Sequence, residues 1–156
     1  IINNLIEKKV SEPSNKDNII FDGYPRNIDQ AKSLDSMLQK YNQIISLVIN
    51  LKVENSVLVK RISGRVSCSI CKKPFNEYFD APVDPSECTN NECKRRDLIK
   101  RSDDNENTVS NRLKIYERTT LPLLKFYQTK GIVKNVDAMK SINEVTDQII
   151  SIIGDL

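Results

Sequence analysis

The sequence has 156 residues and a formal net charge of +3, with neither histidine nor tryptophan. This length fits one domain with room for a small inserted subdomain. So small a charge gives no basic surface for nucleic acid, and no apolar run approaches the ~20 residues of a membrane span. The first ten residues lack the charged-then-apolar pattern of a signal peptide. We therefore expect a cytoplasmic protein without nucleic-acid or membrane partners.

The first half of the chain alternates apolar segments with turns. Residues 2–10 carry apolar side chains at helical spacing without a start methionine or a cap before them. We therefore expect that an N-terminal portion is missing. Residues 18–22 predict a short buried strand, and a turn rich in Gly and Pro follows it. The elements expected next are a helix over residues 28–40 capped by Asn27, a strand over residues 44–51 and a helix over residues 54–62.

The second half begins with a turn-rich, aromatic segment, residues 64–101, which predicts a small β subdomain. It has too few aliphatic residues for a large core, so a metal would be its main staple. The elements expected after it are a long helix over residues 103–130 kinked at Pro122, a strand over residues 132–136 and a helix over residues 141–153. Strands alternating with helices predict an α/β fold with a parallel sheet.

The four cysteines form two close pairs, Cys68-x2-Cys71 and Cys88-x4-Cys93. Two such pairs have the ligand spacing of a structural zinc site, which has no open position for chemistry. The gap inside the second pair is wider than usual. Disulfides and free thiols are the alternatives, but a disulfide scaffold normally spreads its cysteines along the chain. Zinc is the favoured interpretation.

Arginines stand on both sides of the cysteine segment, at Arg61, Arg65, Arg101 and Arg112. Guanidinium groups match phosphate oxygens geometrically, and phosphoryl transfer requires mainly positioning and charge stabilisation. Any one of them alone is better explained as a solvated side chain or a weak surface ion pair. Their placement at both ends of one segment favours phosphate binding.

Polar residues also follow two of the predicted strands. Asp22, Gly23 and Arg26 come after one, and Asp137 and Lys140 come after another. In parallel sheets, ligands gather at these carboxyl ends. An aspartate there can hold hydrated magnesium, and a nearby arginine can hold a phosphate. A turn or helix-capping role for Asp22 is equally open on these grounds.

Several of these segments together resemble one enzyme family. The segment Phe21-Asp22-Gly23-Tyr24-Pro25-Arg26-x3-Gln30-Ala31 resembles the Asp-Gly-(Phe/Tyr)-Pro-Arg-x3-Gln-Ala signature of adenylate kinases. The segments that resemble the two ends of that family's LID are Arg61-Ile-x-Gly64-Arg65 and Arg101-x-Asp103-Asp104 with Thr108-Val109-x2-Arg112-Leu113. Pro122-Leu123 and Val136-Asp137 match as well, so the resemblance covers essentially the whole chain. The long cysteine-bearing LID is similar to that of zinc-carrying bacterial members, whereas uridylate and cytidylate kinases have a short one.

The resemblance implies a three-layer P-loop-kinase-like core, residues 1–63 and 102–156, with an inserted LID, residues 64–101. It implies a monomer that transfers a phosphoryl group from MgATP to AMP and gives two ADP. The implied AMP-binding residues are Gly23, Tyr24, Pro25, Arg26, Gln30, Arg101 and Arg112. The implied ATP-binding residues are Arg61, Arg65, Pro74, Phe75 and Lys140. The implied catalytic residues are Arg65, Arg101, Arg112 and Asp22, the last through Mg²⁺; Asp103 and Asp104 would close the LID, and Cys68, Cys71, Cys88 and Cys93 would hold Zn²⁺.

The sequence departs from the family pattern in three ways. It contains no Gly-x-x-x-x-Gly-Lys phosphate loop, Val66 stands where many members have a second arginine, and the last cysteine pair is wide. We therefore expect these residues alone to be inactive. One alternative is a kinase for another nucleoside monophosphate, against which Gln30 argues. The other is a non-catalytic zinc-ribbon module that binds nucleotides, which would not need the Asp-Gly-Tyr-Pro-Arg turn.

Overall fold

The computed structural model describes residues 2–16, 19–81, 88, 93 and 97–155. The chain divides into two compact units. Unit 1 comprises Ile1–Lys52 and Ile115–Leu156, and unit 2 comprises Val53–Lys114. Helices and strands are mixed in the chain, as expected for an α/β protein. None of the described helices combines the length and apolar character that crossing a bilayer requires.

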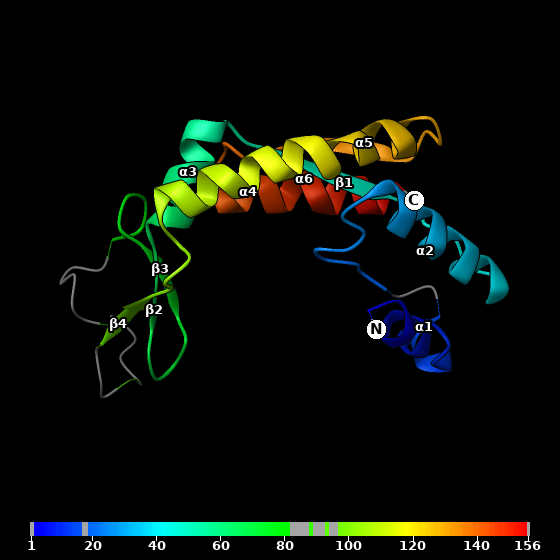
Figure 1. The fold of residues 1–156 in the computed structure, drawn as a ribbon, viewed down its shortest axis with the longest axis horizontal. Coiled ribbons are helices and arrows are strands. Elements are labelled where there is room, and N and C mark those ends of the chain that lie inside the picture. The colour runs from blue at the N-terminus through cyan, green and yellow to red at the C-terminus, as the bar shows by residue number, and fades with distance from the viewer. Residues whose placement is uncertain (1, 17–18, 82–87, 89–92, 94–96, 156) are drawn as a thin grey trace. The chain divides into compact units, whose positions relative to one another are not determined.

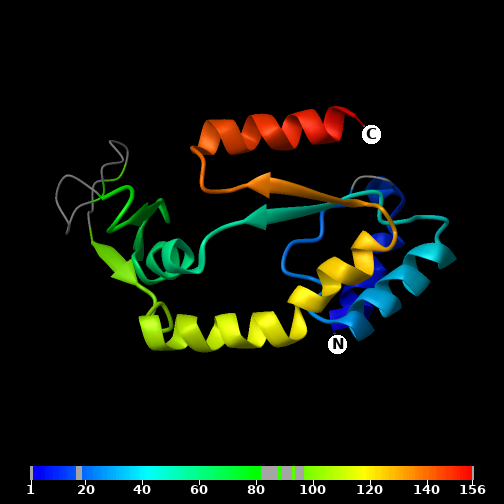
Figure 2. The same cartoon turned by 90° about the horizontal axis from the view of Figure 1, so that it is seen from above.

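Unit 1 contains a parallel pair of strands, β1 (Val48–Lys52) and β5 (Val133–Asp137). The register places Val48 opposite Val133 and Lys52 opposite Asp137, and Figure 2 shows the two arrows running the same way side by side. The predicted parallel sheet is confirmed. β1 begins four residues later than the sequence suggested, at Val48 instead of Ile44.

The strand expected over residues 18–22 is a wrong prediction. Residues 19–22 form neither strand nor helix, and residue 18 lies outside the described part of the chain. Ile19 and Phe21 pack on a core cluster, whereas Ile20 is 92% exposed. A strand also needs a hydrogen-bonded neighbour, and in the described sheets β1 and β5 pair only with each other. The apolar run at residues 19–21 therefore resembles a strand in sequence, but the described sheets offer it no neighbouring strand to pair with.

The helices of unit 1 are α1 (Ile2–Val10), α2 (Ile28–Lys40), α5 (Leu121–Gln128) and α6 (Ile142–Gly154), with a 3₁₀ turn η1 (Pro13–Asn15). α1 and α2 share a core of Val10, Leu34, Met37 and Leu38. α2 and α5 share a second core, Ala31, Leu123 and Tyr127, which also receives Val48 and Val133 from the sheet. α6 packs along β5 (Figure 2).

The long helix expected over residues 103–130 is two helices, α4 (Glu106–Thr119) and α5. Pro122 lies in the first turn of α5, directly after Thr120 and Leu121. Proline has no backbone N–H, and its ring clashes with the carbonyl four residues earlier, so it ends the preceding helix. The expected kink at Pro122 is thus a complete break, and α4 begins in unit 2 and ends in unit 1.

Unit 2 contains α3 (Asn55–Ser63) and a small antiparallel sheet (Figure 1). Its strands are β2 (Arg65–Cys68), β3 (Pro74–Asn76) and β4 (Leu98–Lys100), in the order β3-β2-β4. The buried core of this sheet consists of Val66, Cys68, Phe75, Cys88 and Cys93. Three of these five residues are cysteines, so the aliphatic content is low, as the sequence predicted.

Candidate functional site

The turn that follows residues 19–22 in unit 1 is bent back on itself. Gly23 has a φ of +70°, a conformation that L side chains rarely adopt. A Cβ atom at Gly23 would also lie 3.3 Å from Nη2 of Arg26. The Arg26 Nε donates to the Gly23 carbonyl at 2.8 Å, and the Tyr24–Pro25 peptide bond is cis. The positive φ and the close approach of Arg26 therefore explain why a glycine stands at this position of the Asp-Gly-Tyr-Pro-Arg segment.

The start of α2 holds this turn in place. The side chain of Asn27 accepts from the Gln30 N–H at 2.9 Å, which confirms the predicted cap. The Gln30 Oε1 accepts in turn from the backbone N–H of Arg26 at 2.7 Å. Thr120, just before α5, donates its hydroxyl to the Arg26 carbonyl at 2.9 Å. Asp22 and Arg26 remain exposed beside this braced backbone.

Lys140 lies in the turn between β5 and α6 and is exposed. The next residue, Ser141, caps α6 in a capping box with Glu144. Asp137, at the end of β5, accepts from the Met139 N–H at 3.0 Å. Both polar segments predicted at strand ends thus lie in exposed turns of unit 1, although only the second follows a formed strand.

In unit 2 three of the four predicted arginines, Arg65, Arg101 and Arg112, act on one buried carboxylate, that of Asp104. Arg65 donates from Nε and Nη2 to the two oxygens of Asp104, each at 2.8 Å. Asp104 is 1% exposed, and the Arg65 side chain is 35% exposed. The hydrogen bonds from Arg65 lower the pKa of Asp104 against the effect of burial, and the charges of Arg65, Arg101 and Arg112 lower it further. The three arginines therefore favour the ionised form of this buried carboxylate.

Arg112 and Arg101 complete this cluster. Arg112 forms an ion pair with Asp103, and both side chains are about half exposed. Arg101 is exposed, and its carbonyl accepts from the Asp104 N–H at 3.1 Å. The structure thus brings together Arg65, Arg101 and Arg112 with both aspartates. Such a set of forked donors can bind several phosphate oxygens at once.

Arg61 and Gly64 lie at the end of α3, against residues that the sequence reasoning missed. The guanidinium carbon of Arg61 lies 5.9 Å from the ring centroid of Phe79. A Cβ atom at Gly64 would lie 2.5 Å from the Tyr78 ring, closer than real atoms come. The available signal was an aromatic pair directly after β3, but sequence spacing gave no reason to place it on α3.

Pro74 and Phe75, predicted to touch ATP, lie in β3. Phe75 is buried in the core of unit 2, whereas Pro74 is exposed. The Nζ of Lys73 lies 5.2 Å from the centroid of the Phe75 ring. The phenyl ring of Phe75 is therefore a core group, and Pro74 is the exposed residue of the two.

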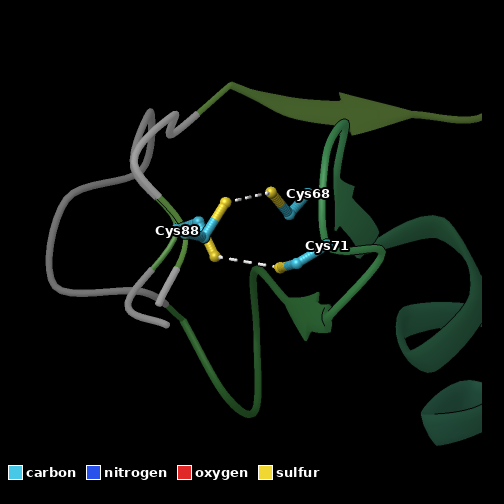
Figure 3. A group of neighbouring side chains, drawn as sticks. Cys68, Cys71 and Cys88 are labelled. Atoms are coloured by element: carbon cyan, nitrogen blue, oxygen red, sulfur yellow. Dashed lines mark hydrogen bonds between the residues drawn. The ribbon is translucent and has the colours of Figure 1, made fainter. Parts of the chain in front are cut away.

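The four cysteines converge in unit 2, and Figure 3 shows sulfurs of the labelled cysteines facing across the cluster. All four sulfur atoms lie within 4.8 Å of one another. Cys68 and Cys93 are 3.5 Å apart, and Cys71 and Cys88 are 3.6 Å apart. A disulfide bond needs about 2.05 Å, whereas zinc–sulfur bonds of about 2.3 Å give tetrahedral edges of roughly 3.8 Å. The spacing thus fits a four-thiolate metal site.

The chemistry of the donor set agrees with that fit. Cys68, Cys88 and Cys93 are buried, while Cys71 is exposed. Burial raises the pKa of the Cys68 thiol, but hydrogen bonds from the backbone of Cys71 and Ile70 and from the Cys93 side chain lower it, and the net pKa lies below its ordinary value. Metal ligation requires the thiolate form. The four cysteines could therefore hold a metal ion.

Comparison with known proteins agrees with these features. The family model for adenylate kinase matches residues 1–132. The chain is 38% identical to an adenylate kinase of Magnetococcus marinus over 154 residues, covering 99% of this chain and 71% of the relative. It is 35% identical to one of Bacillus velezensis and 36% identical to one of Nitrosococcus oceani, covering 69% and 68% of those relatives. The chain belongs to the adenylate kinase family.

Proposed function

We propose that the protein transfers a phosphoryl group reversibly from MgATP to AMP and so makes two ADP. The observation that carries this proposal is the cluster of Arg65, Arg101 and Arg112 around the buried Asp104, in a chain of this family. Phosphoryl transfer spreads negative charge over the oxygens in flight, and forked cations placed in advance stabilise that charge. No side-chain nucleophile is required.

On the ATP side, Arg61 and Arg65 bind ATP, with Arg65 at the phosphoryl that moves. About a third of the Arg65 side chain is exposed, so a phosphate can approach its outer face while Asp104 holds the other. Lys140 and the backbone of Pro74 and Phe75 contact the rest of the nucleotide. The exposure of Lys140 and the burial of the Phe75 ring are compatible with these roles.

On the AMP side, the turn from Gly23 to Arg26 holds the nucleotide, together with Gln30, Arg101 and Arg112. The braced backbone of the turn presents the exposed Arg26 side chain for the α-phosphate. The Gln30 oxygen is bonded to the Arg26 N–H, so its amide NH₂ is the group available to donate to a ring nitrogen of adenine. Asp22, which is exposed, offers the oxygen ligand that hydrated Mg²⁺ prefers.

Catalysis then consists of alignment and charge neutralisation. The arginines hold the two phosphates in line, which converts a bimolecular reaction into one within the complex. Residues 64–101 act as a LID that closes over the nucleotides and excludes water. Asp103 and Asp104, which pair with Arg112 and Arg65, hold the closing arginines in position.

Zinc is the metal that we propose for Cys68, Cys71, Cys88 and Cys93. The sulfur spacing and the thiolate-favouring surroundings of Cys68 support it. With four protein ligands the ion supplies no chemistry, and it stabilises the small core of unit 2. A monomer remains what the family resemblance implies, and the confinement of all four cysteines to one short segment supports a reducing, cytoplasmic location.

The direct test is an assay of ADP formation by the full encoded protein with MgATP and a panel of acceptors. We expect turnover with AMP well above that with UMP, CMP or GMP. Preference for another monophosphate would replace AMP as the acceptor. Absence of turnover with every acceptor, from a folded protein, would contradict the proposal.

A further inference from the structure

The last carbonyl groups of α3 need hydrogen-bond donors from outside the helix, and the sequence does not reveal which residues supply them. The last four carbonyl groups of an α-helix lack partners within the helix. In α3, the Gly64 N–H donates to the carbonyls of Lys60 and Ile62. The carbonyl of Arg61 instead accepts from the side-chain amide of Asn76, at 2.8 Å and fifteen residues further along the chain. A side chain of β3 therefore caps the helix that carries Arg61.

The same carboxamide also shapes the turn after β3. The Asn76 Oδ1 accepts from the Tyr78 N–H at 2.9 Å. The Glu77 N–H donates to the Gly64 carbonyl at 2.8 Å. The Tyr78 ring lies so close to Gly64 that no Cβ atom would fit there. The turn over residues 76–79 and the end of α3 are thus joined by two hydrogen bonds and one tight contact.

The same turn also contacts the guanidinium group of Arg61. Phe79, at the end of the turn, lies under the guanidinium of Arg61 at 5.9 Å. Asn76 is also the residue directly opposite Arg65 in the β2–β3 register. The Asn76 side chain, which is only partly buried, therefore caps the helix end that carries Arg61, and the backbone of the same residue pairs opposite Arg65.

We propose that Asn76 is a positioning residue for phosphoryl transfer, which acts through Arg61 by capping the end of α3. The proposal rests on the proposed function, because Arg61 matters only if it binds ATP. A displacement of about 1 Å of a group that positions substrate can cost as much as 100-fold in rate. The Asn76 amide thus acts on ATP binding through Arg61.

The substitutions Asn76→Asp and Asn76→Ala separate the two bonds of the carboxamide. Aspartate keeps the acceptor for the Tyr78 N–H but loses the donor to the Arg61 carbonyl, whereas alanine loses both. We expect kcat/KM for ATP to fall roughly 10- to 100-fold in both variants, with KM for AMP unchanged. Asn15→Asp is the matched control, because the Asn15 amide also donates to a helix carbonyl, that of Lys9, at 3.0 Å. It should leave turnover at the wild-type value.

A double-mutant cycle with Arg61→Ala distinguishes positioning from mere stability. The Arg61 carbonyl remains in that variant, so Asn76→Asp should lower the melting temperature to the same extent in both backgrounds. The loss in kcat/KM caused by Asn76→Asp should nearly vanish once the Arg61 side chain is gone. Wild-type kcat/KM for Asn76→Asp, or an equal loss in both backgrounds, would overturn the inference. A wild-type protein that does not phosphorylate AMP would instead overturn the proposed function on which it rests.

Discussion

Arg65 and Asp104 meet in a two-pronged ion pair, with both N–O distances at 2.8 Å and the carboxylate completely covered. The two residues are 39 positions apart, so this pair joins β2 to the segment just before α4. Removing one partner of a buried pair leaves a charge without compensation, which costs more than the pair itself contributes. The stability of unit 2 should therefore depend on Asp104 being charged and paired with Arg65.

We expect Asp104→Asn to lower the free energy of unfolding by about 3 kcal/mol, the lower end of the range for a buried pair because Arg65 can still reach water. Chemical denaturation at neutral pH measures it. Glu77→Gln is the matched control, since the Lys100–Glu77 pair is nearly half exposed on both sides and should contribute less than about 1 kcal/mol. Equal effects of the two substitutions would contradict the reading of Asp104 as a buried partner.

The Arg65–Asp104 pair also predicts that the free energy of unfolding falls at acidic pH. The pKa of Asp104 in the folded state lies below its ordinary value, so its contribution is present above an unfolded pKa of about 3.9 and is lost as pH falls through the folded value. The stability difference between wild type and Asp104→Asn should therefore shrink as pH drops below about 4. A difference that stays constant down to the acid transition would refute this linkage.

Tyr127 predicts the opposite dependence at high pH. Burial first, and the charge of Asp35 next, raise the pKa of Tyr127 from 10.0 to about 12. Because the neutral phenol is favoured in the folded state, this contribution is complete below pH 10 and is lost as pH rises from 10 toward 12. Tyr127→Phe should remove this part of the alkaline loss of stability. Thermal melts of both proteins across that interval measure it, and parallel curves would count against it.

Gly64 is predicted to tolerate no side chain. A Cβ atom there would lie 2.5 Å from the Tyr78 ring, so Gly64→Ala should destabilise the protein by about 1–3 kcal/mol. The second change Tyr78→Ala should recover part of that loss. Gly154→Ala is the control, because nothing lies within 4 Å of its Cβ position, and it should be neutral or slightly stabilising. Unchanged stability in Gly64→Ala would show that the ring moves aside freely.

The cysteine cluster predicts one bound zinc per chain. Chelation should lower the melting temperature, and added zinc should restore it, because the core of unit 2 is otherwise small. Cys68→Ser should abolish metal binding, since the buried Cys68 lies 3.5 Å from Cys93 within the cluster. Elemental analysis and thermal melts are the measurements. A protein without metal that melts at the same temperature would contradict a structural zinc site.

Local signals in the sequence were sufficient to predict where two helices begin. Asn27 and Ser141 were readable as caps or as helix starts because capping depends on residues within one turn. The pairing of Asp104 with a LID arginine was implied by the family resemblance. That the arginine is Arg65, and that it donates two hydrogen bonds, is known only from the structure. Ile20 misled the prediction because an apolar run does not reveal whether a neighbouring strand exists to pair with it.

Other features depend on tertiary contacts that no sequence pattern encodes. The role of Gly64 lies in the approach of Tyr78, and the capping of Arg61 lies in the reach of Asn76 from another strand. Pro122 was recognised as a disturbance, but whether a proline kinks or ends a helix depends on how the flanking segments pack. The residues that position the site were therefore harder to find than the charged residues themselves.

The most direct test of the central claim is the rate of ADP formation from MgATP and AMP by Arg65→Ala and Arg112→Ala in the full encoded protein. Each substitution should lower kcat by ~10³-fold or more, by analogy with arginines that stabilise other transferring phosphoryl groups. Lys114→Ala, an exposed position on α4 outside the cluster, should keep the wild-type rate. Near-normal turnover in both arginine variants would contradict the claim that these guanidinium groups hold the phosphoryl in flight.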